Sequence, residues 1–311
     1  MLYRYAAASA ALLTLVASSS SPKRGLCHVP SEKNPNDDTI WTSTPGSNLT
    51  WYYNYKSSPS PSFKPIKTLQ FVPMLWGASD TDKGTPFLDS IKSQLASGAS
   101  IPYVLAFNEP DGTHATGGSN VSVGLAASTW KKQIEPLKEL GVKVGAPAVT
   151  GSPDGFTWLK NFFKACEGGC NPDFVPVHWY GSFEGLASHI GQVVGAYPNL
   201  TVWVTEWGYA DRGLEDTQRF FNQSVGMFDR WDNITHYSYF GAFRSSISNV
   251  GPNAAMLTEK GELTDIGSWY LGGSATNRIP HKNAAASVTC SYSLWGKLLL
   301  SLLVSEVLAA L

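Results

Sequence analysis

The sequence predicts an α/β fold, a single (β/α)8 TIM barrel, and three observations lead to this prediction. Eight apolar, β-branched and aromatic runs recur along the 311-residue chain, and several are nearly continuous, as strands buried on both faces are. Stretches with helical spacing of apolar residues separate these runs, and such alternation favours a parallel sheet. Without its two ends the chain keeps roughly 260 residues, from 21 to 280, which is near the usual size of one such barrel.

Each expected strand and helix corresponds to one of these runs. The eight expected strands are RGLCHV from Arg24, LTWYYNY from Leu49, LQFVPMLW from Leu69, YVLAFN from Tyr103, KVGAPAV from Lys143, FVPVHWY from Phe174, TVWVTEW from Thr201 and ITHYSYFGAF from Ile234. The expected helices are Pro86–Ala96, Ala126–Leu140, Phe156–Cys166, Glu215–Arg230 and Leu263–Leu271. The stretch 30–47 has little helical pattern, so we expect an irregular first crossover. The sequence has no internal repeat and no linker between domains, so 21–280 is expected to be one domain.

The two ends of the chain are expected to lie outside this fold. Residues 1–20 carry one arginine, then an uncharged apolar run and small residues, which is the order of a secretory signal peptide. Small residues at 283–285 precede a spacer and an apolar tail, and this order predicts a GPI-attachment segment over 284–311. A terminal amphipathic helix is the alternative, because Glu306 lies in the tail. We therefore expect a secreted protein that is GPI-anchored at the plasma membrane or cell wall.

The composition excludes some classes of function and favours another. Charged residues make up 15% of the chain, against about 25% in ordinary soluble domains, and the net charge is −1. Since nucleic-acid binding needs a basic face, we expect no nucleic-acid partner. The 11 Trp, 13 Tyr and 14 Phe residues suit a neutral, hydroxyl-rich ligand with apolar ring faces, which describes a sugar.

Other site classes lack their motifs. The sequence has no phosphate-cradling loop, dinucleotide-binding fingerprint or serine-nucleophile elbow, and its six histidines are scattered. We therefore expect neither a metal nor an organic cofactor, and we expect a monomer.

Cysteines and sequons agree with a secreted protein. Cys166 and Cys170 flank a Glu-Gly-Gly turn and are expected to form a disulfide, while a zinc site would need a second ligand pair that is missing. Cys290 lies in the tail, and Cys27 in the first strand is expected to be a buried free thiol. Five N-x-S/T sequons are expected glycosylation sites: Asn48, Asn120, Asn199, Asn222 and Asn233.

Two glutamates stand at the carboxyl ends of strands, where (β/α)8 barrels build their active sites. Strand four ends with Asn108 and Glu109, and strand seven ends with Glu206. Structural salt bridges are the alternative, but Arg24 and Arg244 are the only arginines near expected strands. Glycoside hydrolysis uses such a carboxylate pair, in which one group donates a proton to the leaving oxygen and the other attacks the anomeric carbon. Asn108 is a neutral donor suited to a sugar hydroxyl.

A series of motifs runs in order from residue 23 to 271: KRGL at 23–26, WYYNY at 51–55, FVPMLWG at 71–77, FNEPD at 107–111, VGAPAV at 144–149, VHWYG at 177–181, VTEWG at 204–208 and GELTDIGSWYL at 261–271. With them the sequence resembles the fungal-type endo-β-1,3-glucanases of glycoside hydrolase family 128, whose domain is called the glycosyl hydrolase catalytic core. NEP and TEWG are shared across a wide clan of retaining glycosidases, and the other motifs carry the narrower resemblance. The resemblance implies that Glu109 is the acid/base, that Glu206 is the nucleophile and that Asn108 is oriented toward the −1 sugar.

Further residues are expected to bind the substrate. The resemblance places His178 and Tyr180 facing the site, with a core histidine as the alternative for His178. Trp76 and Trp207 resemble sugar-stacking platforms, with buried packing as the alternative for both. The cleft wall is expected to include residues of strands two and eight, namely Trp51, Tyr53, Asn54 and Phe240, although only one of Tyr239 and Phe240 can point inward.

The sequence thus predicts a retaining endo-β-1,3-glucanase that hydrolyses β-1,3-glucan of fungal-type cell walls by a two-glutamate double displacement. A non-catalytic β-glucan-binding wall protein and a glycosidase of a mixed-linkage glucan are the alternatives. The pair Glu109 and Glu206 counts against the first, because a binding protein needs neither group. Endo and exo action depend on loop shape, which the sequence does not give.

Overall fold

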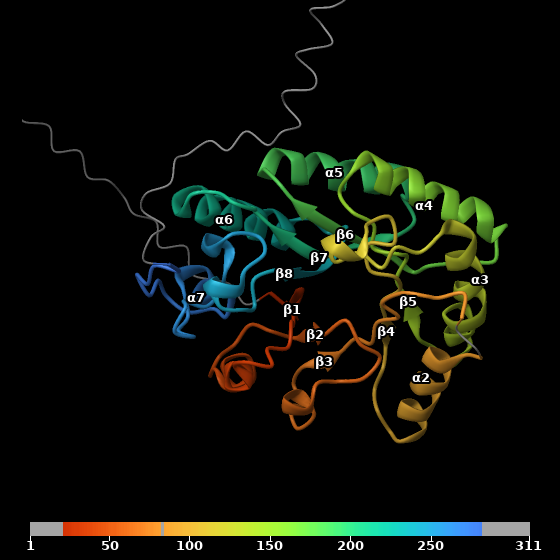
Figure 1. Cartoon of the computed structure of the whole chain (residues 1–311), viewed down its shortest axis with the longest axis horizontal. Helices are drawn as coiled ribbons and strands as arrows, with labels where there is room; N and C mark the ends of the chain where they lie inside the picture. Colours follow the sequence, from red (N-terminus) through yellow and green to blue (C-terminus); the bar gives the residue numbers. More distant parts are fainter. Residues whose placement is uncertain (1–20, 82–83, 282–311) are drawn as a thin grey trace, which may run out of the picture. The chain divides into compact units, whose positions relative to one another are not determined.

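The computed structural model describes residues 21–81 and 84–281, and strands and helices alternate along them (Figure 1). The expected signal peptide at 1–20 and the expected GPI-attachment segment at 284–311 lie outside the described residues. Within the described ranges, no helix is both long and apolar enough to cross a membrane.

Eight parallel strands build the sheet: β1 (Arg24–Cys27), β2 (Trp51–Tyr53), β3 (Gln70–Phe71), β4 (Tyr103–Val104), β5 (Lys143–Val144), β6 (Phe174–Tyr180), β7 (Thr201–Gly208) and β8 (Ile234–Tyr239). Six of them pair in the order β3-β2-β1-β8-β7-β6, and β4 pairs with β5. Isolated parallel bridges lie next to the strands that remain: Met74, after β3, pairs with Leu105, after β4, and Gly145, after β5, pairs with Phe174 of β6. The strands thus follow one another in the order of a (β/α)8 barrel.

The helices lie between the strands in sequence: α1 (Asp38–Ser43), α2 (Pro86–Ala96), α3 (Val123–Gln133), α4 (Pro153–Cys166), α5 (Phe183–Ala196), α6 (Leu214–Arg230) and α7 (Asp265–Tyr270). Three of them start at a serine whose hydroxyl accepts a backbone N–H of the first turn, namely Ser122, Ser152 and Ser182. Helix α5 was not predicted from the sequence, although its buried residues recur at helical spacing. The first crossover was expected to be irregular, but it contains α1 and a short 3-10 turn.

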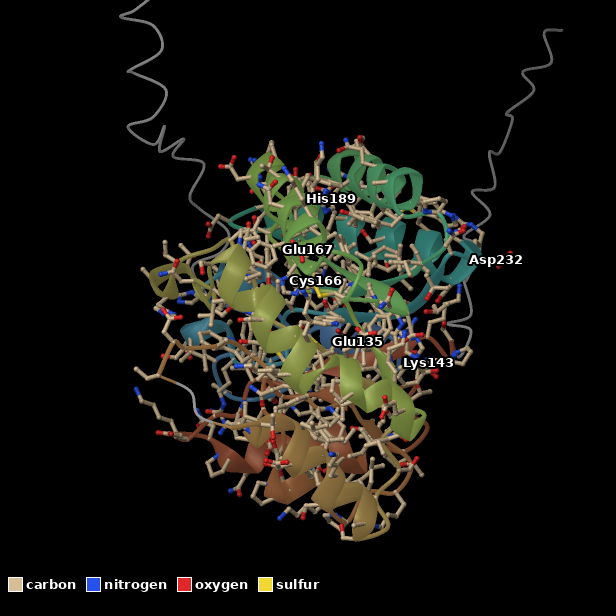
Figure 2. The ribbon with its side chains drawn as sticks, turned by 90° about the vertical axis from the view of Figure 1, so that its right-hand side faces the viewer. Glu135, Lys143, Cys166, Glu167, His189 and Asp232 are labelled. Carbon is tan, nitrogen blue, oxygen red and sulfur yellow. A yellow bond between two sulfur atoms is a disulfide. The ribbon has the colours of Figure 1, made fainter. Side chains whose placement is uncertain are left out.

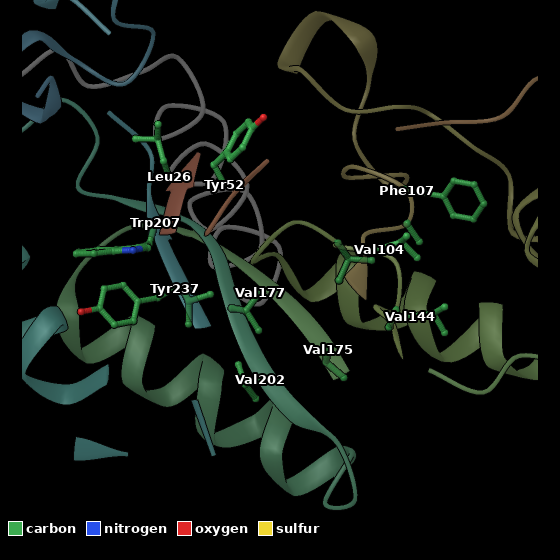
Figure 3. Close-up of a cluster of buried hydrophobic side chains, with 14 of the residues drawn as sticks. Leu26, Tyr52, Val104, Phe107, Val144, Val175, Val177, Val202, Trp207 and Tyr237 are labelled. Atoms are coloured by element: carbon green, nitrogen blue, oxygen red, sulfur yellow. The ribbon is translucent and has the colours of Figure 1, made fainter. Parts of the chain in front are cut away.

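Alternation along the strands separates two apolar layers. Leu26 and Tyr52 belong to the larger layer, in which strands pack against helices (Figure 3). The smaller layer fills the barrel interior, because it joins Trp51 of β2 to Trp203 of β7 at 5.1 Å, although these strands are not neighbours. Residues of one strand thus reach the interior only at every second position.

Two basic residues fasten the amino end of β1 to the last elements of the chain. Lys23 Nζ donates to backbone carbonyls at the end of α6, among them that of Phe228 at 3.0 Å. The buried guanidinium of Arg24 donates to Tyr237 Oη at 3.0 Å and to the carbonyl oxygen of Tyr270 at 2.9 Å. These bonds offset the cost of burying the charge and hold β1 beside β8 and α7.

The structure pairs Cys166, the last residue of α4, with Cys170 in a disulfide (Figure 2). Glu167 follows with φ 51°, a left-handed conformation that turns the chain back toward Cys170. Cys27 is a buried free thiol. The cysteines of the described residues therefore have the arrangement that their spacing predicts.

The sequons differ in accessibility. Asn120, Asn199 and Asn222 are exposed, and Asn233 is half-buried. Asn48 is half-buried with its side-chain nitrogen buried, and its glycosylation stays a prediction, like that of the other sequons.

Arg24→Ala is expected to lower the free energy of unfolding by about 3 kcal/mol or more, because it leaves carbonyl groups and the Tyr237 hydroxyl without a buried donor. Arg278→Ala is the matched control, since Arg278 and Glu262 form an exposed ion pair that contributes about 1 kcal/mol or less. Urea unfolding of both variants measures the difference. Equal losses would contradict the anchoring role of Arg24.

Candidate active site

Glu109 stands just after β4 in a strained turn. Its backbone φ angle is 39°, in the left-handed region that residues other than glycine rarely adopt. Its backbone N–H donates to the carbonyl of Ala148 at 2.6 Å, and its own carbonyl accepts from Gly112 at 2.9 Å. The preceding residue, Asn108, donates its N–H to the carbonyl of Trp76. The ends of β3, β4 and β5 together therefore fix the carboxylate of Glu109 at the barrel mouth.

Glu206 lies on β7 and is 5% exposed. Tyr55 Oη donates to its Oε1 at 2.7 Å, and Tyr180 Oη donates to its Oε2 at 2.6 Å. An ionised carboxylate only accepts hydrogen bonds, so two phenol donors match it. Burial raises the pKa of both phenols well above the usual range, so that they keep their protons and remain donors.

His178 lies between the two glutamates. Its Nδ1 is 3.0 Å from Glu109 Oε1 and 3.5 Å from Glu206 Oε2. The β6–β7 ladder shifts register between Val177 and His178, and the shift brings His178 opposite Glu206. One carboxylate oxygen of each glutamate and the imidazole nitrogen all lie within 4.8 Å of one another. Among the described residues, this set could also hold a metal ion, although glycoside hydrolysis by two carboxylates does not require one.

The charged groups in this cluster shift one another's pKa values. Burial raises the pKa of Glu206; His178 lowers it, Glu109 raises it further, and the two phenol donors lower it. The net effect is a pKa above the ordinary value for a glutamate. Burial lowers the pKa of His178, but the carboxylates of Glu206 and Glu109 outweigh burial and raise it overall. A positive His178 can therefore offset part of the negative charge of the pair.

An open cleft of about 1030 Å³ lies over the two carboxylates. Its walls combine aromatic rings with small polar residues, as expected of a sugar site, and include Trp76, Trp179, Tyr180, Phe240, Thr150 and Asn249. A second hollow of about 550 Å³ adjoins it at Trp76, whose ring stacks on His114 at 5.8 Å. Asn108 donates to the carbonyl of Gly117, and its buried Oδ1 has no protein partner.

The structure brings six of the residues proposed from the sequence to one place. Glu109, Glu206, Asn108, Trp76, Tyr180 and Phe240 line the cleft. His178 lies beneath it in contact with both carboxylates and is fully buried.

Four other expected binding residues do not line the cleft. Trp207 is fully buried outside the barrel, where its ring packs on Phe221 at 5.6 Å, so packing and not sugar stacking explains it. Trp51 lies deep in the barrel interior, with its indole N–H donating to the carbonyl of Lys23. Tyr53 is also buried there, and its hydroxyl donates to the carbonyl of Thr205.

Asn54 is the fourth of these residues. Its amide is buried and donates to the hydroxyl of Ser60 at 2.9 Å, so it stabilises the loop after β2 and does not line the cleft.

Two residues that line the cleft, Tyr55 and Trp179, were not predicted from the sequence as site residues. Tyr55 belongs to the WYYNY motif and shares the strand parity of Trp51 and Tyr53, which is the signal that could have found it. Because it stands two residues further along, it reaches the mouth and contacts Glu206. Trp179 lines the cleft from the end of β6.

Comparison with known proteins gives a family match over nearly the whole described chain. The family model described as glycosyl hydrolase catalytic core matches residues 25–270. Alkali-sensitive linkage protein 1 of Schizosaccharomyces pombe is 29% identical over 266 residues, which cover 82% of this chain and 45% of the relative. The chain thus spans less than half the length of that protein.

Solved structures of glycoside hydrolase family 128 share the fold. A subgroup IV endo-β-1,3-glucanase from Lentinula edodes is 25% identical with a TM-score of 0.65, over 80% of this chain and 99% of that one. A subgroup III curdlan-specific exo-β-1,3-glucanase from Blastomyces gilchristii, in complex with glucose, is 25% identical with a TM-score of 0.64, over 81% and 98%. A subgroup VII oligosaccharide-binding protein from Cryptococcus neoformans is 24% identical with a TM-score of 0.62, over 85% and 97%. The chain therefore belongs to the glycosyl hydrolase catalytic core family and, with these structural neighbours, to glycoside hydrolase family 128.

Proposed function

We propose that the chain is a retaining endo-β-1,3-glucanase. One observation carries the proposal: Glu109 and Glu206 face the same cleft, and one carboxylate oxygen of Glu109 lies within 4.8 Å of one carboxylate oxygen of Glu206. Retaining glycosidases hold their carboxyl groups about 5–5.5 Å apart, whereas inverting ones need about 6.5–9.5 Å to admit a water. The activity of the 25%-identical neighbours on β-1,3-glucan supports the substrate class.

The two glutamates differ in surroundings, and this difference supports their roles. Glu206 is held by two phenol donors, which fix its oxygens for attack on the anomeric carbon. As the bond from Glu206 to that carbon forms, the glycosidic bond breaks and the leaving oxygen takes a proton from Glu109. Water then gives its proton to Glu109 and displaces Glu206, which restores both groups and retains the β configuration. Asn108 lines the cleft, and its buried Oδ1 has no protein partner, so we assign it as the acceptor for a hydroxyl of the sugar bound next to Glu109.

Endo action is the part of the proposal that the cleft shape supports. The main cleft is open, and the hollow beyond Trp76 continues it on the side of the loop after β4. A chain that extends past the scissile bond in both directions needs such a continuous groove. Exo action is the alternative, because one structural neighbour is an exo-β-1,3-glucanase. The sizes of the products released from laminarin oligomers labelled at the reducing end distinguish endo from exo action.

A non-catalytic glucan-binding protein is the second candidate, because one neighbour is an oligosaccharide-binding protein. The contacts of Glu206 argue against it, because two phenol donors hold a buried carboxylate that a binding site does not need. An assay of the wild type and Glu206→Gln on β-1,3-glucan decides between them. Sugar release by the wild type alone supports the enzyme, and binding without release by either protein supports the second candidate.

Glu206→Ala is expected to lose at least about 10³-fold in polymer hydrolysis, because the nucleophile is gone. Azide should restore turnover with a glycosyl azide of inverted configuration. Glu109→Ala should lose polymer hydrolysis but keep much of the glycosylation step on an activated aryl glucoside, which needs no protonation, and azide should then give the retained β-glycosyl azide. NMR of the azide products measures both outcomes.

Glu215→Gln is the control for these variants, because Glu215 is an exposed residue of α6 and should leave activity unchanged. Near-normal polymer hydrolysis by Glu206→Ala would contradict the assigned roles.

The raised pKa of Glu206 predicts two pH dependences. Activity should fall with decreasing pH as Glu206 takes up a proton, at a pH above the ordinary glutamate value of about 4.3. Because the pKa is higher in the fold than in the unfolded chain, ionising Glu206 destabilises the fold as the pH rises through these values. Glu206→Gln should therefore melt at a higher temperature than the wild type at neutral pH, and the difference should vanish near pH 4. A pH-independent difference in melting temperature would contradict this account.

We further propose that the protein is secreted and GPI-anchored near residue 283, from the sequence of its two ends. Phospholipase C treatment of expressing cells should release it. Recovery of a freely secreted protein that still carries the peptide 284–311 would overturn this proposal.

A further inference from the structure

Cys27 contacts the hydroxyl that holds the nucleophile. Its Sγ lies 2.9 Å from Tyr55 Oη, and Tyr55 Oη lies 2.7 Å from Glu206 Oε1. The thiol is fully buried in the barrel interior, in the layer that also contains Trp51, and it has no disulfide partner. Two hydrogen bonds, through Tyr55, therefore connect the thiol to the proposed catalytic carboxylate.

The direction of these hydrogen bonds follows from counting protons. When Glu206 is ionised it can only accept, so Tyr55 must give its one proton to Glu206. The oxygen of Tyr55 is then an acceptor, and the thiol of Cys27 is the donor. Tyr53 Oη is also near Tyr55 Oη, at 3.4 Å, but its single proton has the shorter bond to the carbonyl of Thr205 at 3.0 Å.

Burial keeps the thiol in the donor form. Burial raises the pKa of Cys27, and the negative charge of Glu206 raises it further, while hydrogen bonds with Tyr53 and Tyr55 lower it only in part. The groups that face Cys27 are thus the phenols of Tyr53 and Tyr55 and the carboxylate of Glu206, and the thiol of Cys27 keeps its proton beside them.

We propose that Cys27 is a positioning residue, whose thiol donates to Tyr55 and so strengthens the hydrogen bond from Tyr55 to Glu206. Hydrogen bonds in a chain polarise one another, because a hydroxyl that accepts becomes a better donor. The thiol thus helps to keep Glu206 ionised and oriented for attack. This inference rests on the proposed role of Glu206 as nucleophile.

The test compares two substitutions at position 27. Cys27→Ser keeps a hydrogen-bond donor, whereas Cys27→Val puts an apolar, slightly larger side chain there that has none. In Cys27→Val, the acid limb of the pH profile for kcat/KM on a laminarin oligomer should move up by about 0.3 pH unit, since a neighbouring bond strengthens a hydrogen bond by roughly 10–30%. Cys27→Ser should keep the wild-type midpoint or lower it.

Val72→Ala is the matched control for packing. Val72 lies in the same buried layer and has no polar side-chain atom, so its truncation should lower the melting temperature without moving the acid limb. Equal midpoints for Cys27→Val and the wild type, or an equal shift in Val72→Ala, would overturn the proposal.

An infrared measurement tests the same bond without any activity. The S–H stretching band of Cys27, identified by its loss in Cys27→Val, should move to higher frequency in Tyr55→Phe because the acceptor is removed. An unchanged band would overturn the hydrogen bond itself. If the wild type hydrolyses no glucan, the proposed function fails while this spectroscopic result still decides whether Cys27 donates to Tyr55.

Discussion

The hydrogen bonds from Tyr55 and Tyr180 to Glu206 are the interaction on which the site depends. A carboxylate at 5% exposure is costly to ionise unless donors replace the lost water. The two phenols supply those donors from β6 and from the loop after β2, and His178 adds a third polar contact. Tyr180 and His178 both lie on β6, whereas Tyr55 lies in the loop after β2, so side chains from two separate parts of the barrel stabilise the buried, ionised nucleophile.

The position of a side chain along the barrel axis also decides whether it can reach the carboxylate of Glu206. Trp51 and Tyr53 of β2 and Tyr55 in the loop after it lie at increasing height: Trp51 packs in the interior, Tyr53 donates to the backbone of β7, and Tyr55 donates to the carboxylate of Glu206. On the opposite side, the left-handed turn at Glu109 presents the second carboxylate at the mouth, where it meets the cleft. One glutamate is thus held rigidly from below, and the other faces the open cleft, as the two roles require.

Strand order and the two glutamates could be predicted from the sequence, because buried parallel strands and carboxylates at their ends leave strong patterns. Trp207 could not be placed by residue type, since tryptophan suits both a core and a sugar platform. Strand parity would have resolved it: Glu206 faces the interior, so its neighbour must face the helices. The sequence carries no comparable signal for how deep a residue lies in the barrel or for the register shift before His178. These two features determine that Trp51 and Tyr53 are buried below the cleft and that His178 lies opposite Glu206.

The stereochemistry of the first product tests the central claim most directly. If the carboxylates act as nucleophile and acid/base at the separation found here, NMR during hydrolysis of a β-1,3-glucan oligomer should show the β-anomer of the new reducing end appear first, followed by slow conversion to the equilibrium mixture. Appearance of the α-anomer first would mean that a water attacks directly. That result would contradict the covalent role of Glu206.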